Sequence, residues 1–165
     1  MRILGIDPGY AIVGWGVLDY EQSRFRVVDF GAIRTPAKTD TNARLESIYH
    51  GIEQIIETYA PTHMGIEELF FNTNQTTAIV VAEARGVILL AAKQHGLTIG
   101  EYTPLQVKQS VVGYGRAEKN QVIRMVTMML GLEKPPKPDD TADALAIAIC
   151  HGHSYSSRIG NYYNQ

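Results

Sequence analysis

The first 35 residues alternate between apolar and polar positions in a way that predicts three β-strands. Residues 2–7 form a short apolar segment, and a turn at Pro8 and Gly9 follows it. Residues 12–20 carry apolar side chains at alternate positions, the period of a half-buried strand, and residues 25–34 are similar. Because the connections are short, we expect these strands to form an antiparallel meander.

From residue 41 onward the apolar positions recur at helical spacing. One face of an amphipathic helix over residues 41–59 carries Leu45, Ile48, Ile52, Ile55, Ile56 and Tyr59. Further segments alternate between strand and helix patterns. Strands are predicted at 62–69 and 97–102, and helices at 75–94, 104–111, 118–130 and about 140–152. This order predicts an α/β fold, with a meander that leads into a mixed five-stranded sheet flanked by helices.

The length of 165 residues fits one domain, which we place at residues 1–153, followed by a loosely held tail at 154–165. No apolar run is long enough to cross a membrane. Cys150 is the only cysteine, so a disulfide scaffold is excluded and a cytoplasmic location is expected. The formal net charge is -2, but it divides unevenly between −5 over residues 1–84 and +3 over residues 85–165. A basic strip lies at residues 104–124, which hold Lys108, Arg116, Lys119 and Arg124 against Glu118 alone, and such a strip can bind a polyanion even in an acidic chain.

Several acidic residues stand at the ends of predicted elements. Asp7 ends an apolar strand, and Glu67 lies near the end of another. Asp140 and Asp143 are spaced i, i+3, so they share one face at the start of the last helix. Each has an ordinary alternative role, because a single aspartate often caps a turn or a helix and a glutamate at a strand end can face solvent.

The four acids together are more informative than any one of them. Two strand ends and one helix start can converge at the edge of an α/β sheet. Carboxylates that meet there repel one another, and divalent cations with a preference for oxygen ligands, such as Mg²⁺ or Mn²⁺, relieve that repulsion. Two such ions form the clamp that is used in phosphodiester hydrolysis.

Four stretches of the chain together resemble the RuvC family of Holliday-junction endonucleases. They are ILGIDPGYAIVGWGV, GIEELFF, LQVKQSVVGYGRAEKNQV and DDTADALAIAI, and they span residues 1 to about 152. The resemblance implies an RNase H-like fold, a homodimer, a requirement for Mg²⁺ and four-way junction DNA as the substrate. It also implies that Asp7, Glu67, Asp140 and Asp143 are the catalytic, metal-binding acids.

Two of these acids have acidic neighbours. The family pattern places the ligand at Glu67, directly after an apolar residue, and strand alternation turns Glu68 to the opposite face. Asp139 follows a proline and is expected to act as a helix N-cap. We expect His151 and His153 to lie aside from the metal site.

The basic strip acquires roles from the same resemblance. Lys108 and Lys119 match the lysines of the family's QVKQ and AEK motifs, and one or both are expected near the scissile phosphate. Arg116 would add a phosphate contact. The resemblance places Phe70 at the junction crossover, where it could stack on an unpaired base, although one of two adjacent aromatics is ordinarily core.

The sequence therefore predicts a Mg²⁺-dependent endodeoxyribonuclease of DNA recombination and repair, for which Mn²⁺ would substitute. Two ions per active site would give 5′-phosphate and 3′-hydroxyl ends through paired symmetric nicks. A homodimer would match the two-fold symmetry of the junction, with helix 75–94 and its small alanines as the candidate interface. The RuvA–RuvB branch-migration complex is an expected partner. The alternatives are a ribonuclease H on RNA–DNA hybrids, a junction-binding protein with an inactive site, and an ATP-binding fold of the actin type, which needs a second lobe.

Overall fold

A computed structural model describes residues 1–69 and 75–157. Its elements follow the predicted order, and most boundaries agree within a few residues. The strands are β1 (Arg2–Asp7), β2 (Ile12–Glu21), β3 (Arg24–Arg34), β4 (His63–Glu67) and β5 (Thr98–Tyr102). The helices are α1 (Thr41–Tyr59), α2 (Gln75–Gln94), α3 (Pro104–Val112), α4 (Lys119–Met129) and α5 (Asp139–Ser156).

The strands form one mixed sheet in the order β3-β2-β1-β4-β5. β1, β2 and β3 pair antiparallel, whereas β1 with β4 and β4 with β5 pair parallel. This confirms the predicted meander that leads into parallel strands. The parallel register aligns Ile6 of β1 with Ile66 of β4, so both strands end at the same edge of the sheet.

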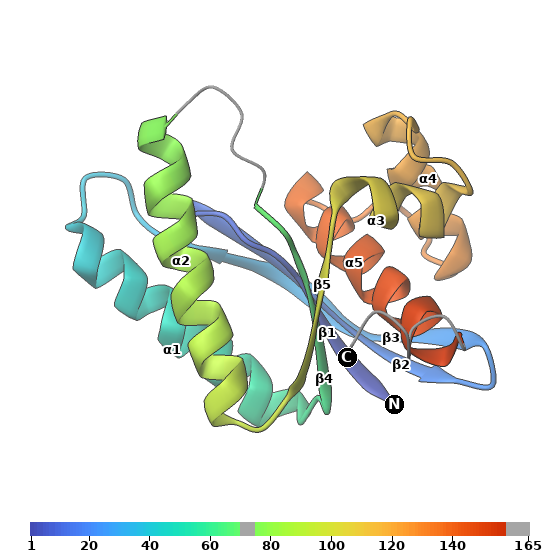
Figure 1. The fold of residues 1–165 in the computed structure, drawn as a ribbon, viewed down its shortest axis with the longest axis horizontal. Coiled ribbons are helices and arrows are strands. Elements are labelled where there is room, and N and C mark those ends of the chain that lie inside the picture. The colour runs from blue at the N-terminus through green and yellow to red at the C-terminus, as the bar shows by residue number, and fades with distance from the viewer. Residues whose placement is uncertain (70–74, 158–165) are drawn as a thin grey trace.

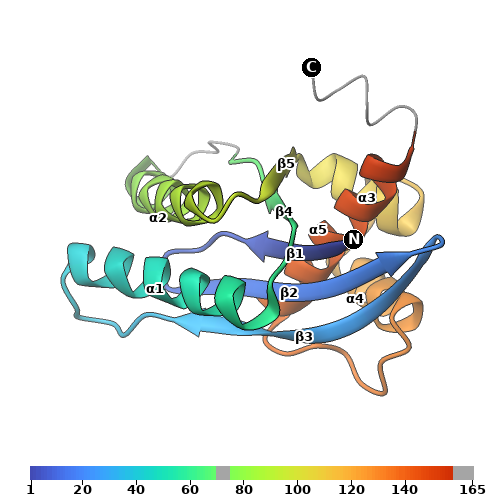
Figure 2. The same ribbon diagram turned by 90° about the horizontal axis from the view of Figure 1, so that it is seen from below.

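Helices cover both faces of the sheet (Figures 1 and 2). α1 and α2 pack on one face, where Leu4 and Ile6 of β1 belong to a buried cluster with Ile52 and Ile88. α5, with α3 and α4 beyond it, packs on the other face, where Ile3 joins a second cluster. Successive side chains along a strand point to opposite faces, so Ile3, Gly5 and Asp7 face α5.

α5 lies unusually close to the sheet because glycines face it. A Cβ atom on Gly5 would stand 2.1 Å from the carbonyl oxygen of Ala144, and one on Gly14 would stand 2.0 Å from that of Asp140. No side chain fits at either position, and glycine within a strand often marks such a close backbone approach. These two glycines therefore set how closely the first turns of α5 approach β1 and β2.

The last helix is longer than predicted. α5 continues through Ser156 rather than ending near residue 152, and Tyr155 packs its ring against those of His63 and His151. The first residues of the predicted tail are therefore helical, and residues 158–165 lie outside the described part of the chain. None of the described helices is long and apolar enough to span a membrane.

Candidate active site

Two of the predicted acids end neighbouring parallel strands. Asp7 is the last residue of β1 and Glu67 the last of β4. The alternation that sends Ile6 and Ile66 toward α1 and α2 turns both carboxylates toward α5. A local pattern of apolar residues followed by an acid thus becomes a pair of acids on one face of the sheet.

The other two acids lie in the first turns of α5. Asp143 lines the same pocket as Asp7 and Glu67. Asp140 lies one turn earlier, with its backbone directly over Gly14, and Gly14 is the β2 residue that pairs with Asp7. Asp140 is not among the residues that line the pocket, but its charge is close enough to act on Asp7. The sequence-predicted acids are therefore brought together, with Asp140 at the margin.

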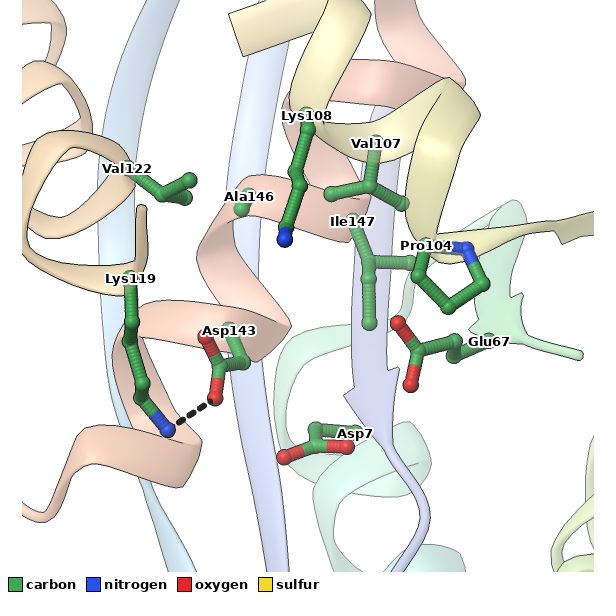
Figure 3. A pocket seen from close by; sticks show the side chains of 10 residues that line it. All are labelled: Asp7, Glu67, Pro104, Val107, Lys108, Lys119, Val122, Asp143, Ala146 and Ile147. Carbon is green, nitrogen blue, oxygen red and sulfur yellow. Dashed lines mark hydrogen bonds and ion pairs between the residues drawn. The ribbon is translucent and has the colours of Figure 1, made fainter. Parts of the chain in front are cut away.

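A pocket of about 200 Å³ lies between these acids, α3 and α4 (Figure 3). Three acids border it, Lys108 points into it from α3, Lys119 lies beside Asp143, and the rest of the lining is mostly apolar. The lining residues are Asp7, Glu67, Pro104, Val107, Lys108, Lys119, Val122, Asp143, Ala146 and Ile147. The pocket can thus hold an anionic group beside a concentrated set of carboxylates.

The electrostatic state of Asp7 reflects this crowding. Burial, and then the negative charges of Asp143, Glu67 and Asp140, raise the pKa of Asp7 to about 8, although Lys119 opposes them. The pKa of Glu67 is also raised, first by burial and then by Asp143, against the lowering effect of Lys108 and Lys119. A cation placed among these groups would favour their ionised forms.

The two lysines are held by the starts of α3 and α4. At the start of α3, the amide of Gln106 donates to Thr103 Oγ1 (3.1 Å) and the amide of Thr103 donates to Gln106 Oε1 (2.8 Å), a capping box that fixes the helix carrying Lys108. Lys119 is the first residue of α4, and its Nζ donates to Asp143 Oδ2 at 2.9 Å. That hydrogen bond is the main reason that the pKa of Lys119 is raised.

The donor chemistry suits a hard divalent cation, but the carboxylates surround the pocket instead of converging on one point. Among residues 1–69 and 75–157, no three His, Cys, Asp or Glu side chains are gathered tightly enough to hold a metal ion as they stand. Asp143 instead uses one oxygen to accept from Lys119. The hydrogen bond to Lys119 engages only Oδ2 of Asp143, so its other oxygen could contribute to binding an ion.

The neighbouring acids and histidines do not line this pocket. Glu68 follows the end of β4, and its backbone amide donates to the Tyr102 carbonyl (2.8 Å). The prediction that Asp139 caps α5 is wrong, because Asp139 already belongs to the helix and Pro138 is the N-cap residue. The Asp139 carboxylate instead accepts from Lys137 Nζ at 2.9 Å. His151 is buried and hydrogen-bonded to His63 and Tyr102.

Two predicted DNA contacts remain predictions. Arg116 lies exposed in the turn between α3 and α4, outside the pocket lining. Phe70 lies outside the described residues.

The structural role of Gly5 and Gly14 was missed by the sequence reasoning, although glycine at alternate or isolated strand positions is the signal that could have indicated it.

The fold and the site define an α/β domain of the RNase H-like class, with acids at the ends of adjacent parallel strands and on the helix that crosses them. The family model described as "Crossover junction endodeoxyribonuclease RuvC" matches residues 3–151. The chain belongs to this family.

Known relatives cover nearly the whole chain. The Alkaliphilus metalliredigens crossover junction endodeoxyribonuclease RuvC is 60% identical over 154 residues, which span 93% of this chain and 94% of that protein. The Thermus thermophilus RuvC structure superposes with a TM-score of 0.88 at 34% identity, covering 97% of each chain. A second structure, of T. thermophilus RuvC in complex with a Holliday junction substrate, gives a TM-score of 0.88 at 31% identity and covers 96% of this chain and 98% of that one.

Proposed function

We propose that this protein is a structure-selective endonuclease that resolves four-way DNA junctions by paired symmetric nicks. The observation that carries the proposal is the single pocket that Asp7, Glu67 and Asp143 share with Lys108 and Lys119, in a chain of this family. The T. thermophilus relative whose complex with a Holliday junction has been solved supports the same substrate.

The acids would bind Mg²⁺, with Mn²⁺ as a substitute, and two ions per site are the expected number. When bound, such ions supply activation of the attacking water and stabilisation of the leaving oxygen, so that hydrolysis gives 5′-phosphate and 3′-hydroxyl ends. Asp7 and Glu67 are positioned by paired strands, which makes them the fixed part of the site. Asp143 and Asp140 belong to α5, and Asp143 pairs with Lys119 through one of its two oxygens.

The lysines would act on the phosphate. Lys108 points into the pocket from α3, and Lys119 reaches it from α4 (Figure 3). Both are therefore suited to hold a phosphodiester beside the acids and to stabilise charge that develops in the transition state. Arg116, exposed between them in the sequence, is expected to contact the DNA backbone farther from the cut.

A homodimer would supply two such sites. Helix α2 remains the candidate interface, but three of its alanines, Ala84, Ala91 and Ala92, lie in the core and Ala82 is half-buried. The face of α2 opposite the core exposes Ile79 (60%) and Leu90 (52%), and between them Gly86 leaves space for close approach. We take this face as the dimer interface, and a loss of dimer in Leu90→Arg by analytical ultracentrifugation tests it.

We also expect the RuvA–RuvB complex as a partner, on family membership alone.

The deciding experiment is cleavage of a synthetic four-way junction with Mg²⁺ or with EDTA. A linear duplex of the same sequence and an RNA–DNA hybrid serve as competing substrates. We expect paired nicks in the junction that require the metal, with little cleavage of either competitor, and 5′-phosphate ends that a ligase can seal. Preferential cleavage of the hybrid would instead identify a ribonuclease H, and binding without cleavage would identify a junction-binding protein.

A further inference from the structure

An arginine of α2 holds the end of the strand that carries Glu67. Arg85 Nε donates to the backbone carbonyl of Glu67 at 3.0 Å. Its guanidinium also forms an ion pair with the carboxylate of Glu101 on β5. Only 15% of the Arg85 side chain is exposed, against 49% of the Glu101 side chain, so the bond to the Glu67 carbonyl is better shielded from water than the ion pair.

The position of this contact matters because it is where support from the sheet decreases. β4 pairs with β1 only as far as Ile66, whereas its pairing with β5 continues to Glu67 and Tyr102. The last strand residue thus lacks a paired neighbour on the β1 side. A charge-assisted hydrogen bond to the Glu67 carbonyl restrains the backbone from which the carboxylate projects into the pocket.

We propose that Arg85 is a positioning residue for Glu67, fixing the end of β4 so that this carboxylate keeps its place opposite Asp7. The inference rests on the proposed function, in which Glu67 is one of the metal-binding acids. Arg85 lies on α2, so it also links the helix of the proposed dimer interface to the active-site strand by a direct polar contact.

The fork of the guanidinium is what suits arginine to this role. It donates to a carbonyl with one nitrogen while another pairs with a carboxylate, in a fixed plane. Lysine can reach one of these acceptors but cannot hold the two in the same geometry. Arg85→Lys should therefore restore part of what Arg85→Gln loses, and Glu101→Gln, which keeps the bond to Glu67, should have the mildest effect.

The chain offers a matched control at the opposite end of the sheet. Arg2 Nε pairs with Asp19 Oδ1 at 2.8 Å, and Arg2 Nη1 donates to the backbone carbonyl of Tyr59 at 2.8 Å. This is the same combination of one carboxylate and one carbonyl, but it lies at the start of β1, away from the pocket. Arg2→Gln should cost stability without changing the active site.

The experiment compares wild type, Arg85→Gln, Arg85→Lys, Glu101→Gln and Arg2→Gln in three measurements. These are junction affinity in EDTA, the single-turnover cleavage rate at saturating junction as a function of Mg²⁺, and the rise in melting temperature on titration with Mg²⁺. For Arg85→Gln we expect affinity within about twofold of wild type and a cleavage rate lowered by about tenfold or more. Its thermal titration should need about tenfold more Mg²⁺, the usual effect of losing a group that orients a metal ligand.

Two results would overturn the inference. One is an Arg85→Gln protein that, corrected for the folded fraction, cleaves and responds to Mg²⁺ as wild type does. The other is an equal loss of rate in Arg2→Gln, which would assign the effect to general stability. If Arg85→Gln does not fold, the comparison between Arg85→Lys and Arg2→Gln decides. Failure of wild type to cleave the junction would be a different result, because it would remove the proposed function and this inference with it.

Discussion

His151 should contribute a loss of stability in mild acid, which opposes the gain that protonation of Asp7 contributes over the same pH range. Its ring is 1% exposed, with Nε2 3.1 Å from Nδ1 of His63 and Nδ1 3.0 Å from the hydroxyl of Tyr102. A neutral ring satisfies both contacts when the Tyr102 hydroxyl donates to Nδ1 and Nε2–H donates to His63. Burial, and then the neighbouring His63, lower the pKa of His151 from 6.5 to about 4.

The direction of the effect follows from proton linkage. Above about pH 6.5 the ring is neutral in both the folded and the unfolded chain, and no penalty arises. Between about pH 6.5 and about pH 4 the unfolded chain binds a proton that the folded chain does not, so the free energy of unfolding decreases. A pKa difference of about 2.5 corresponds to about 3 kcal/mol, since each pKa unit is worth about 1.4 kcal/mol.

Urea unfolding in EDTA, followed by circular dichroism from about pH 7.5 to about pH 4.5, gives the free energy of unfolding at each pH. The difference between the profiles of wild type and His151→Gln measures the contribution of His151. His151→Gln should be less stable than wild type at the upper pH, by about 1–3 kcal/mol for the disturbed buried hydrogen bonds, but should lose less on acidification. His63 and His153 keep part of the slope, because burial lowers the pKa of each of them too. His50→Gln, on the exposed side of α1, removes a histidine without touching this cluster. Parallel pH profiles for wild type and His151→Gln would refute the reasoning.

The remaining predictions concern the pocket and its supports. Asp7→Asn should abolish junction cleavage while preserving binding. The raised pKa of Asp7 destabilises the fold progressively as pH rises from 3.8 to about 8, so in EDTA this variant should melt above wild type near pH 8, and the advantage should shrink on acidification and disappear at about pH 4. Lys108→Ala and Lys119→Ala should each reduce the salt dependence of junction binding by about one unit of slope, or lower the single-turnover rate more than the affinity; no change in either quantity would place them on an inert surface. Gly14→Ala should lower the melting temperature, since its methyl meets the backbone of α5, and should reduce cleavage by the protein that remains folded. Phe70→Ala should lose junction cleavage with an unchanged melting temperature, whereas a core role would cost about 3–5 kcal/mol of stability.

Much of the fold was determined by local patterns in the sequence. The alternation in residues 2–34 and the helical spacing from residue 41 onward depend only on near neighbours along the chain, so they predicted the elements and the meander. The same reasoning placed Asp7 at a strand end and put Asp140 and Asp143 on one helical face. Resemblance to a family then singled out Glu67 and the two lysines.

Tertiary structure decided what depends on contacts between distant segments. Helix α2 and its alanines were a candidate interface, yet Ala84, Ala91 and Ala92 face the core, because which side of an apolar helix is buried depends on the sheet and on α1. Asp139 was a plausible cap by position, but it is the first residue of α5, and its carboxylate pairs with Lys137. Neither outcome can be obtained from spacing along one segment.

The geometry of the active site itself also belongs to the tertiary structure. Gly14 is an ordinary strand glycine in the sequence, and only the crossing of α5 over β2 explains why no side chain fits there. Arg85 and Glu67 are 18 residues apart in the chain, and the bond between them exists because α2 returns beside the end of β4. Periodicity indicates the buried face of an amphipathic element, whereas the distance between packed faces is set by packing, and the separation of the acids depends on that distance.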